Sequence, residues 1–440
     1  MKRSAYFEAV RGVDLVRRVG RVVHLAGLAI ESEGPDAPIG EVCEIRPRGG
    51  AEPLRAEVIG LRGDRVVLMA YGDTRGIGTG CEVVATGRLP AIAVGDALLG
   101  RVIDAFGDPL DDKPAPLGLS TRPLRSTPLN PLSRPRVDTV LETGVRCIDG
   151  LLTLGQGQRV GIFAGSGVGK STLLGMICRH VRADVNVVAL IGERGREVRE
   201  FVEKHLGPEG LQRSVVIVAT SDLPALARAR AAYAATAIAE YFRDQGLQVL
   251  LTMDSVTRFA MARREIGLAA GEPPTARGYT PSVFAELPEL CERCGTAPSG
   301  GAITALYTVL VEGDDFNEPI SDILRATLDG HIVLTRKLAH AGHFPAIDVL
   351  QSASRLLTDL IATTDLPLLH KLLAQVATYE RNRDMIDIGA YRPGNNPEID
   401  QAIALMPAMN RFLRQSGDEV ANRATVMNML RQLARAEGTT

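Results

Sequence analysis

Tryptophan is missing from this 440-residue chain, and aromatic residues together make up only 4% of it. Positive charge is not in excess either, because the formal net charge at pH 7 is −2. Proteins that bind nucleic acid combine basic surfaces with exposed aromatic rings on which bases stack. We therefore expect no nucleic-acid partner.

Long hydrophobic runs are missing as well. No apolar run reaches the ~18 residues that a membrane-spanning helix needs, and the first residues lack the apolar core of a secretory signal. We expect a cytoplasmic protein that contacts the inner face of the cytoplasmic membrane only peripherally. The six cysteines are scattered along the chain, which is typical of reduced thiols rather than of a disulfide framework.

Composition and periodicity divide the chain into four parts. Residues 1–20 fit an N-terminal amphipathic helix, which is either frayed or docks on a partner or a membrane surface. Residues 21–92 carry short alternating strands separated by glycines, which predicts a small β-barrel. We expect residues 93–365 to form an α/β domain and residues 366–440 a helical C-terminal domain.

Individual elements can be predicted within these parts. Continuous apolar runs are typical of parallel strands that are buried on both faces, whereas barrel strands alternate. The barrel strands are expected at 21–25, 40–45, 56–60 and 65–69, the parallel strands at 185–191, 214–220, 248–253 and 302–310, and helices at 225–243 and 397–412. The proline-rich residues 113–135 predict an extended connector.

The strongest motif is a phosphate-binding loop that follows a β-branched run and precedes an apolar helical pattern. It consists of Gly165, Ser166, Gly167, Val168, Gly169, Lys170, Ser171 and Thr172, with Ala164 where the strict pattern has glycine. Glycines let backbone N–H groups turn toward an anion, and the helix N-terminus adds partial positive charge. Lys170 is expected to reach the β- and γ-phosphates and Ser171 to ligate Mg²⁺. The loop predicts that the chain binds a nucleoside triphosphate.

Two carboxylates follow apolar strands and extend this site. Asp254 ends the run at 248–253, and Glu193 comes directly after the run at 185–191. Ligands of open parallel sheets gather at the carboxyl ends of the strands. We therefore expect Asp254 in the Mg²⁺ shell, partly through water, and Glu193 as the general base for an attacking water. Alone, Glu193 also fits a surface carboxylate in a charged turn.

The motifs occur in the order seen in the catalytic subunits of rotary ATPases, which this chain resembles. They lie at 99–109, 144–149 (with Arg146), 165–171, 192–194, 254–259 and 344–355. Within that superfamily the chain looks most like the ATPases of flagellar and related type III protein export. This closer resemblance is carried by 165–176, 195–201, 237–244, 264–274 and 278–284, and residues 27–35 favour the flagellar branch over the injectisome branch.

The resemblance implies a fold and a set of roles. The α/β domain would be a RecA-like P-loop domain with a parallel sheet that hydrolyses ATP with Mg²⁺. Lys170 and Glu193 would be catalytic, Arg194 and Arg258 would lie near the γ-phosphate, and Arg355 would be an arginine finger in the neighbouring subunit's site. Phe344 would pack on adenine, with help from Tyr391.

The resemblance also implies partners. A homo-hexamer would surround a pore, where loops at 271–275 and 312–319 face a coiled-coil stalk protein. The N-terminal helix would bind a stator-like regulatory protein, and the ring would act on the export gate, chaperones and secreted substrates. Alternatives are a virulence-type export ATPase, a non-catalytic nucleotide-holding subunit, a hexameric RNA translocase or a subunit of a proton-driven ATP synthase. Glu193 argues against the non-catalytic subunit. The scarcity of aromatic residues in the barrel, where Tyr71 is the only one between residues 21 and 90, argues against the RNA translocase.

Overall fold

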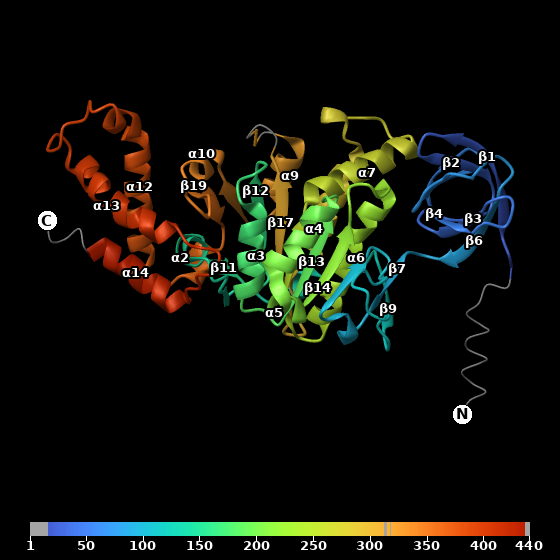
Figure 1. The fold of residues 1–440 in the computed structure, drawn as a ribbon, viewed down its shortest axis with the longest axis horizontal. Coiled ribbons are helices and arrows are strands. Elements are labelled where there is room, and N and C mark those ends of the chain that lie inside the picture. The colour runs from blue at the N-terminus through green and yellow to red at the C-terminus, as the bar shows by residue number, and fades with distance from the viewer. Residues whose placement is uncertain (1–15, 312–314, 317, 436–440) are drawn as a thin grey trace.

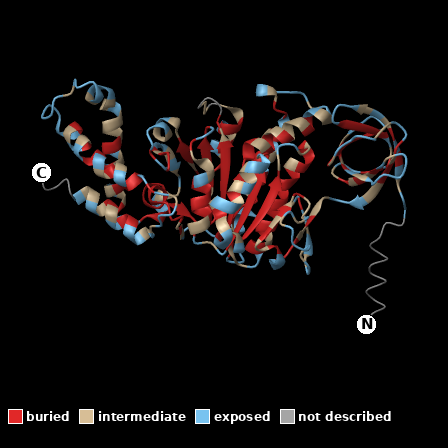
Figure 2. Ribbon diagram, in the orientation of Figure 1, coloured by how far each residue is buried: buried red, intermediate tan, exposed pale blue. Residues whose placement is uncertain are grey.

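The computed structural model describes residues 16–311, 315–316 and 318–435. It is elongated, with a β-barrel at one end, a helix-covered sheet in the middle and helices at the other end (Figure 1). Buried residues gather inside the barrel, along the central strands and on the inner sides of the terminal helices (Figure 2). The expected fold class is confirmed.

The barrel closes in the strand order β1-β2-β5-β4-β3-β6. Its strands are β1 Val19–Ala26, β2 Ala29–Glu33, β3 Val42–Arg46, β4 Leu54–Arg62, β5 Arg65–Ala70 and β6 Glu82–Arg88. The alternation of apolar residues places side chains such as Val22, Ile45 and Leu68 in its core. The four strands expected from the sequence are present, and β2 and β6 are additional.

The predicted N-terminal helix lies mostly outside the described residues, which begin at residue 16. Where its last residues are described, the prediction is wrong, because Val19 and Gly20 already belong to β1. Gly20 approaches Gly34 so closely that a Cβ on it would lie 2.1 Å from a backbone atom of that residue. The β-barrel therefore begins within the stretch assigned to the helix.

The connector between barrel and sheet is extended, as expected, and it is fixed by arginines. Arg134 donates to the carbonyls of Glu292 and Cys294 at 2.6 and 2.9 Å, and Arg122 binds Asp244 at 2.9 Å. Its elements are β7 Ala91–Val94, η1 Asp96–Leu98, β8 Arg101–Asp104, β9 Ser120–Pro123 and η2 Pro131–Ser133. Two short strands that follow, β10 Val140–Leu141 and β11 Leu154–Gly155, pair with each other.

The central sheet has the order β19-β18-β12-β17-β15-β13-β14-β8, and within this order only β19 is antiparallel to its neighbour in the described residues. The strands are β12 Arg159–Ala164, β13 Val185–Ile191, β14 Ser214–Ala219, β15 Gln248–Asp254, β16 Gly295–Thr296, β17 Ala302–Leu310, β18 Gly330–Leu334 and β19 Ile347–Ser354. The four parallel strands expected from apolar runs are present within one residue at each end. β8 joins the sheet from the connector.

Alternate residues of the strands pack on opposite helical layers. Val187 and Ala189 of β13 belong to the core with α6 and α7, whereas Val188 and Leu190 belong to the core with α3. The helices of this part are α2 Arg146–Leu151, α3 Lys170–His180, α4 Gly195–Glu200, α5 Gly207–Gln212, α6 Ala225–Asp244, α7 Val256–Ala270, α8 Pro281–Glu292, α9 Pro319–Thr327, α10 Arg336–His340 and α11 Leu357–Leu360. The π-helix η3 Phe201–Leu206, between α4 and α5, and the short 3₁₀ helix η4 Ala276–Gly278 complete them.

The C-terminal helices are α12 Leu366–Asp387, α13 Pro397–Leu413 and α14 Arg423–Arg435. Asn396 caps α13 by accepting from the N–H of Glu398 at 2.9 Å. Met409, Phe412 and Leu430 bury their side chains in the same core as α2 and α3. This shared core joins the helical end to the nucleotide-binding part. No helix among the described residues has the length and apolar character needed to cross a membrane.

Candidate active site

The phosphate-binding loop joins β12 to α3 at the carboxyl edge of the sheet. Gly167 and Gly169 have φ angles of 77° and 87°, which glycine adopts without steric cost. Lys170 is the first residue of α3 and Ser171 the second, so the free N–H groups of the helix start lie in the loop. The other loop residues divide by exposure: Gly165 and Val168 are buried, and Ser166, Gly167 and Thr172 are exposed. An anion can therefore reach the loop from solvent.

Lys170 and Asp254 form the centre of the site. The Lys170 ammonium contacts Asp254 Oδ1 and lies 3.7 Å from Glu193 Oε1. Thr308 Oγ1 on β17 donates to the same Asp254 oxygen at 2.7 Å. Burial disfavours the charged Lys170, but the two carboxylates outweigh it and raise its pKa. Strands β12, β15 and β13 thus bring the three predicted residues together.

Glu193 is half-buried beside this pair. Gly192 makes the turn out of β13 with φ of 70°, and the carbonyl of Glu193 accepts from the N–H of Ser221 at 3.1 Å. Burial and the negative charge of Asp254 raise the pKa of Glu193 to about 7, against the opposing effect of Lys170. A carboxyl with a pKa near working pH suits a general base.

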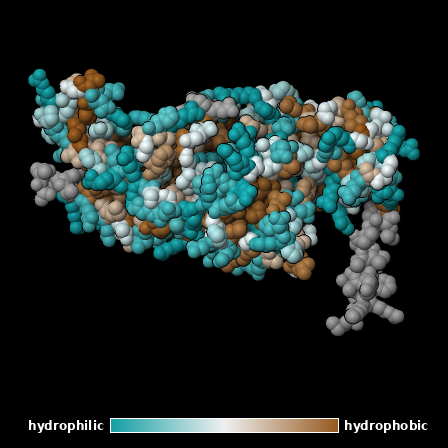
Figure 3. All heavy atoms as spheres, in the orientation of Figure 1, coloured by the Kyte–Doolittle hydropathy of each residue, from teal (hydrophilic) through white to brown (hydrophobic). Residues whose placement is uncertain are grey.

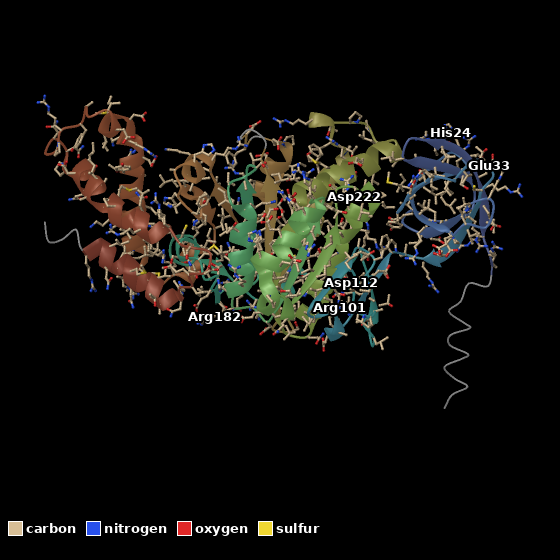
Figure 4. All side chains as sticks on the ribbon, in the orientation of Figure 1. His24, Glu33, Arg101, Asp112, Arg182 and Asp222 are labelled. Carbon is tan, nitrogen blue, oxygen red and sulfur yellow. The ribbon has the colours of Figure 1, made fainter. Side chains whose placement is uncertain are left out.

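Figure 4 helps to locate the two edges of the sheet. Asp222, in the loop after β14, lies on one edge, and Arg101 and Arg182 lie on the opposite edge. Glu193 is on the same edge as Asp222, because its carbonyl accepts from the N–H of the adjacent Ser221. Arg101 begins β8, which runs parallel to β14, so the amino ends of these strands face away from the site. The reactive groups therefore gather at the carboxyl edge.

The two arginines expected near the γ-phosphate differ in placement. Arg258 on α7 lies against the turn at Gly192, where an added Cβ would be 3.0 Å from the Arg258 stem. Its Nε is buried and has no hydrogen-bond partner. The side chain of Arg194 is 81% exposed and lies 3.7 Å from Glu197. Arg258 is thus beside the site, and Arg194 extends into solvent.

Phe344 lies directly over the phosphate-binding loop. A Cβ on Gly169 would be 3.4 Å from Phe344 Cδ1, and the ring is partly open to solvent. Its carbonyl accepts from the N–H of Gln415 at 2.9 Å. The ring is therefore available to a base whose phosphates occupy the loop.

Tyr391 is placed elsewhere. It follows α12, and its hydroxyl donates to Asp400 at 2.9 Å, at the start of α13. The loop between α12 and α13 lies well away from the start of α3 (Figure 1). Tyr391 is held there because its hydroxyl also accepts from the N–H of Asn396 at 3.2 Å. The structure does not bring it to Phe344.

Arg355 lies at the opposite edge of the sheet from Lys170. Strand β19 is antiparallel to β18, so Ser354 pairs with Gly330, whereas Ile347 pairs with Leu334. Leu334 in turn lies beside Ala164, where the phosphate-binding loop begins. Arg355 is exposed and donates to the carbonyl of Arg325 at 2.8 Å.

Two residues of the site were not expected from the sequence. Thr308 supports Asp254, and a polar residue inside the apolar run at 302–310 was a signal that could have found it. Gln415 contacts Phe344 across 71 positions of sequence. No local pattern indicates that contact.

Comparison with known domains divides the chain as the fold does. The nucleotide-binding domain of the ATP synthase alpha/beta family matches residues 144–354, and the β-barrel domain of the same family matches residues 17–87. The T3SS EscN ATPase C-terminal domain matches residues 364–432. The barrel and the sheet thus match two domains of the ATP synthase alpha/beta family, and the helical end matches the C-terminal domain of a type III secretion ATPase.

Whole-chain relatives carry two names. The chain is 54% identical to the flagellum-specific ATP synthase of Bacillus subtilis, over 96% of both proteins. It is 48% identical to the type 3 secretion system ATPase of Xanthomonas euvesicatoria, over 94% of this chain and 93% of the relative.

Solved structures agree with these relatives. The assembled ATPase EscN of the enteropathogenic E. coli type III secretion system matches with a TM-score of 0.90 and 46% identity, over 94% of this chain and 100% of that one. EscN in complex with its central stalk EscO matches with a TM-score of 0.86 and 45% identity, over the same shares of the two chains. These matches confirm the resemblance noted in the sequence. The chain belongs to the ATP synthase alpha/beta family, in the group formed by flagellum-specific ATP synthases and type III secretion ATPases.

Proposed function

We propose that this protein hydrolyses ATP as the motor subunit of a flagellar or related type III protein export apparatus. The observation that carries the proposal is the contact of Lys170 with both Asp254 and Glu193 at the phosphate-binding loop. A protein that only holds nucleotide has no use for a buried carboxylate poised as a base. Identities to the flagellum-specific relatives range from 47% to 54%, and those to two type 3 secretion relatives are 48% and 49%, so only the highest identities favour the flagellar branch.

The donor set fits Mg²⁺. The Ser171 hydroxyl and the Asp254 carboxylate offer hard oxygen ligands, which Mg²⁺ prefers. Among the described residues, no cluster of three histidine, cysteine, aspartate or glutamate side chains could hold a metal alone. This suits an ion that is shared with nucleotide phosphates. Mg²⁺ would supply positive charge to the β- and γ-phosphate oxygens.

Each side chain of the site then has its own role in hydrolysis. Nucleotide phosphates attract the Lys170 ammonium away from Asp254, because the contact between the two residues is an ion pair that a stronger anion can replace. Glu193 accepts a proton from the attacking water. Arg258 offers its unpaired Nε toward the charge that develops on the γ-phosphate. Phe344 stacks on the base.

Arg355 acts on the site of a neighbouring copy. Within one chain it lies at the sheet edge opposite Lys170, which supports a role across an interface. We propose a homo-hexameric ring, by analogy with the assembled EscN. Apolar side chains gather over the middle of the molecule on a face that is otherwise largely hydrophilic (Figure 3). A patch of that kind suits contact between subunits.

The pore loops support binding of a stalk protein, as EscN binds its stalk EscO. Arg277, just after residues 271–275, pairs with Asp315 at 2.7 Å and with Glu318. This ties one expected pore loop to the described part of the other. We also propose that the N-terminal residues bind a stator-like regulator and that the ring works in the cytoplasm, peripherally on the membrane. There it would act on the export gate, chaperones and secreted substrates.

The test is Mg²⁺-dependent ATP hydrolysis measured as a function of protein concentration. The rate per chain should rise with concentration, because each complete site needs two copies. Glu193→Gln should remove nearly all turnover, whereas Glu203→Gln, at an exposed position 10 residues further along, should not. Full activity of Glu193→Gln would contradict the proposal.

A further inference from the structure

The segment between α13 and α14 joins the helical end of the molecule to the nucleotide site. Gln415, the second residue of this segment, is 5% exposed although it is polar. A buried amide must satisfy its donors and acceptor within the protein, or it costs stability. The partners of Gln415 therefore show what the segment holds in place.

The side chain of Gln415 uses all its principal hydrogen-bonding atoms. Its Oε1 accepts from the N–H of Arg146 at 2.8 Å, at the start of α2. Its Nε2 donates to the carbonyl of Gly144 at 2.8 Å and to that of Glu419 at 2.7 Å. The amide thus fixes the segment to the loop that precedes α2.

The backbone of the same residue reaches Phe344. The Gln415 N–H donates to the Phe344 carbonyl at 2.9 Å, and the Phe344 ring lies over Gly169. One residue therefore joins the loop before α2 to the aromatic ring that overlies the phosphate-binding loop. Phe344 itself is partly exposed, so packing alone holds it only on one side.

Two arginines also hold the segment and the end of α13 in place. Arg146 donates from Nε to the carbonyl of Phe412 at 3.0 Å and pairs with Glu419. Arg179, near the end of α3, donates to the carbonyl of Gly417 at 2.7 Å. Helix α3, which begins with Lys170, therefore also holds the segment through Arg179, near the C-terminal end of the helix.

We propose that Gln415 is a positioning residue for the base-binding wall of the nucleotide site, and that it acts through Phe344. This rests on the proposed function, in which Phe344 stacks on the base. Loss of the side-chain amide leaves the Gly144 carbonyl and the Arg146 N–H unpaired, so the segment moves. The backbone N–H of residue 415 moves with it, and the Phe344 carbonyl loses its fixed donor. A ring that is not held in place binds the base less well. The side chains assigned to the γ-phosphate lie on other elements, so the substitution leaves turnover at saturating nucleotide unchanged.

The experiment is a double-mutant cycle on the full chain. Binding of ATP carrying a fluorescent N-methylanthraniloyl group is titrated for the wild type, Gln415→Leu, Phe344→Leu and the double variant. Each single variant should weaken binding by roughly three- to tenfold, the loss expected for one or two hydrogen bonds or a stacking contact. The double variant should bind no more weakly than Phe344→Leu. Losses that multiply in the double variant would overturn the proposal, because Gln415 would then act independently of Phe344.

Gln158→Leu is the matched control. Gln158 is also fully buried, and its side chain bonds to the N–H of Gly155 and to Asp329 and Ser354, at the opposite edge of the sheet. It should lower the unfolding midpoint about as much as Gln415→Leu and leave the nucleotide Kd unchanged. An equal loss of affinity in Gln158→Leu would overturn the proposal, since a general loosening would then explain the effect.

Steady-state kinetics separate this proposal from the proposed function. Gln415→Leu should raise KM for ATP several-fold with kcat within about twofold of the wild type. Unchanged affinity in Phe344→Leu, with ATP hydrolysis intact, would overturn the role of Gln415 alone. A wild-type protein that does not hydrolyse ATP would instead overturn the proposed function.

Discussion

Replacing Arg355 with alanine tests whether two copies build one reaction centre. Along β18, Gly330 and Leu334 are four residues apart, which is roughly 13 Å of strand. Arg355 follows the residue paired with Gly330, whereas the phosphate-binding loop begins beside Leu334. The loop and the start of α3 add to this distance. An arginine side chain cannot span that gap within its own chain.

The expected magnitude follows from the charge that the guanidinium would stabilise. An arginine finger contributes about 10³–10⁵ in rate, which corresponds to about 4–7 kcal/mol of transition-state stabilisation. Arg355→Ala should therefore lose nearly all turnover. Its affinity for nucleotide should stay close to that of the wild type, because Lys170 and Phe344 are untouched. The assay is steady-state ATP hydrolysis combined with titration of a fluorescent nucleotide.

Mixing two inactive variants gives the sharper form of this test. Lys170→Ala lacks the phosphate-binding lysine but keeps Arg355, and Arg355→Ala keeps the lysine. In a closed ring with head-to-tail interfaces, a productive interface needs one chain that keeps Lys170 and a neighbour that keeps Arg355. Each condition is met half of the time in an equal mixture, so roughly a quarter of the interfaces are productive. We expect the mixture to recover about that fraction of wild-type activity. A mixture that stays inactive although it co-assembles, or a fully active Arg355→Ala, would refute the shared site.

Three further outcomes are expected. Because burial and Asp254 raise the pKa of Glu193 to about 7, kcat/KM for ATP should fall as the pH drops through about 7, where the base becomes protonated; a rate that holds constant to pH 5 would contradict this. Thr308→Val removes the donor 2.7 Å from Asp254 and should lower the free energy of unfolding in urea by about 1–3 kcal/mol, whereas Thr308→Ser should not. Burial raises the pKa of the Cys43 thiol to about 12, so this thiol should react with Ellman's reagent at pH 8 only after unfolding; rapid reaction of the native protein at Cys43 would argue against its burial.

The central strands were predictable because a strand that is buried on both faces has an uninterrupted run of apolar residues. The run at 302–310 is β17 without change of ends, and that at 185–191 is β13. Strand β2, Ala29–Glu33, was not predicted, because its polar residues Glu31 and Ser32 are nevertheless buried in the structure. Glu31 is buried because Arg62 and Arg65 pair with it at 2.6 and 2.9 Å. Such long-range charge pairing has no local signal.

The residues of the candidate site also divide into those that local sequence predicts and those that depend on long-range packing. The phosphate-binding loop is a local motif, and Asp254 and Glu193 follow from the rule that parallel strands end at one edge. Tyr391 was predicted only from resemblance, and its hydrogen bonds to the α13 start place it elsewhere. Gln415 could not be predicted, because its role depends on how the helical end packs against α2.

In the proposed site, the groups that would contact nucleotide come from separate parts of the protein and from a neighbouring copy. Lys170 and Glu193 are fixed to the sheet, whereas the Phe344 carbonyl is held by Gln415, which follows α13. Arg355 would come from the next copy. If a base stacks on Phe344, the hydrogen bond from the Gln415 N–H to the Phe344 carbonyl makes nucleotide binding favour one placement of the segment between α13 and α14. By linkage, a partner that moved this segment would change nucleotide affinity, and nucleotide would change the affinity for that partner by the same factor. Under this proposal the helical end would both sense and control the nucleotide state without contacting the phosphates.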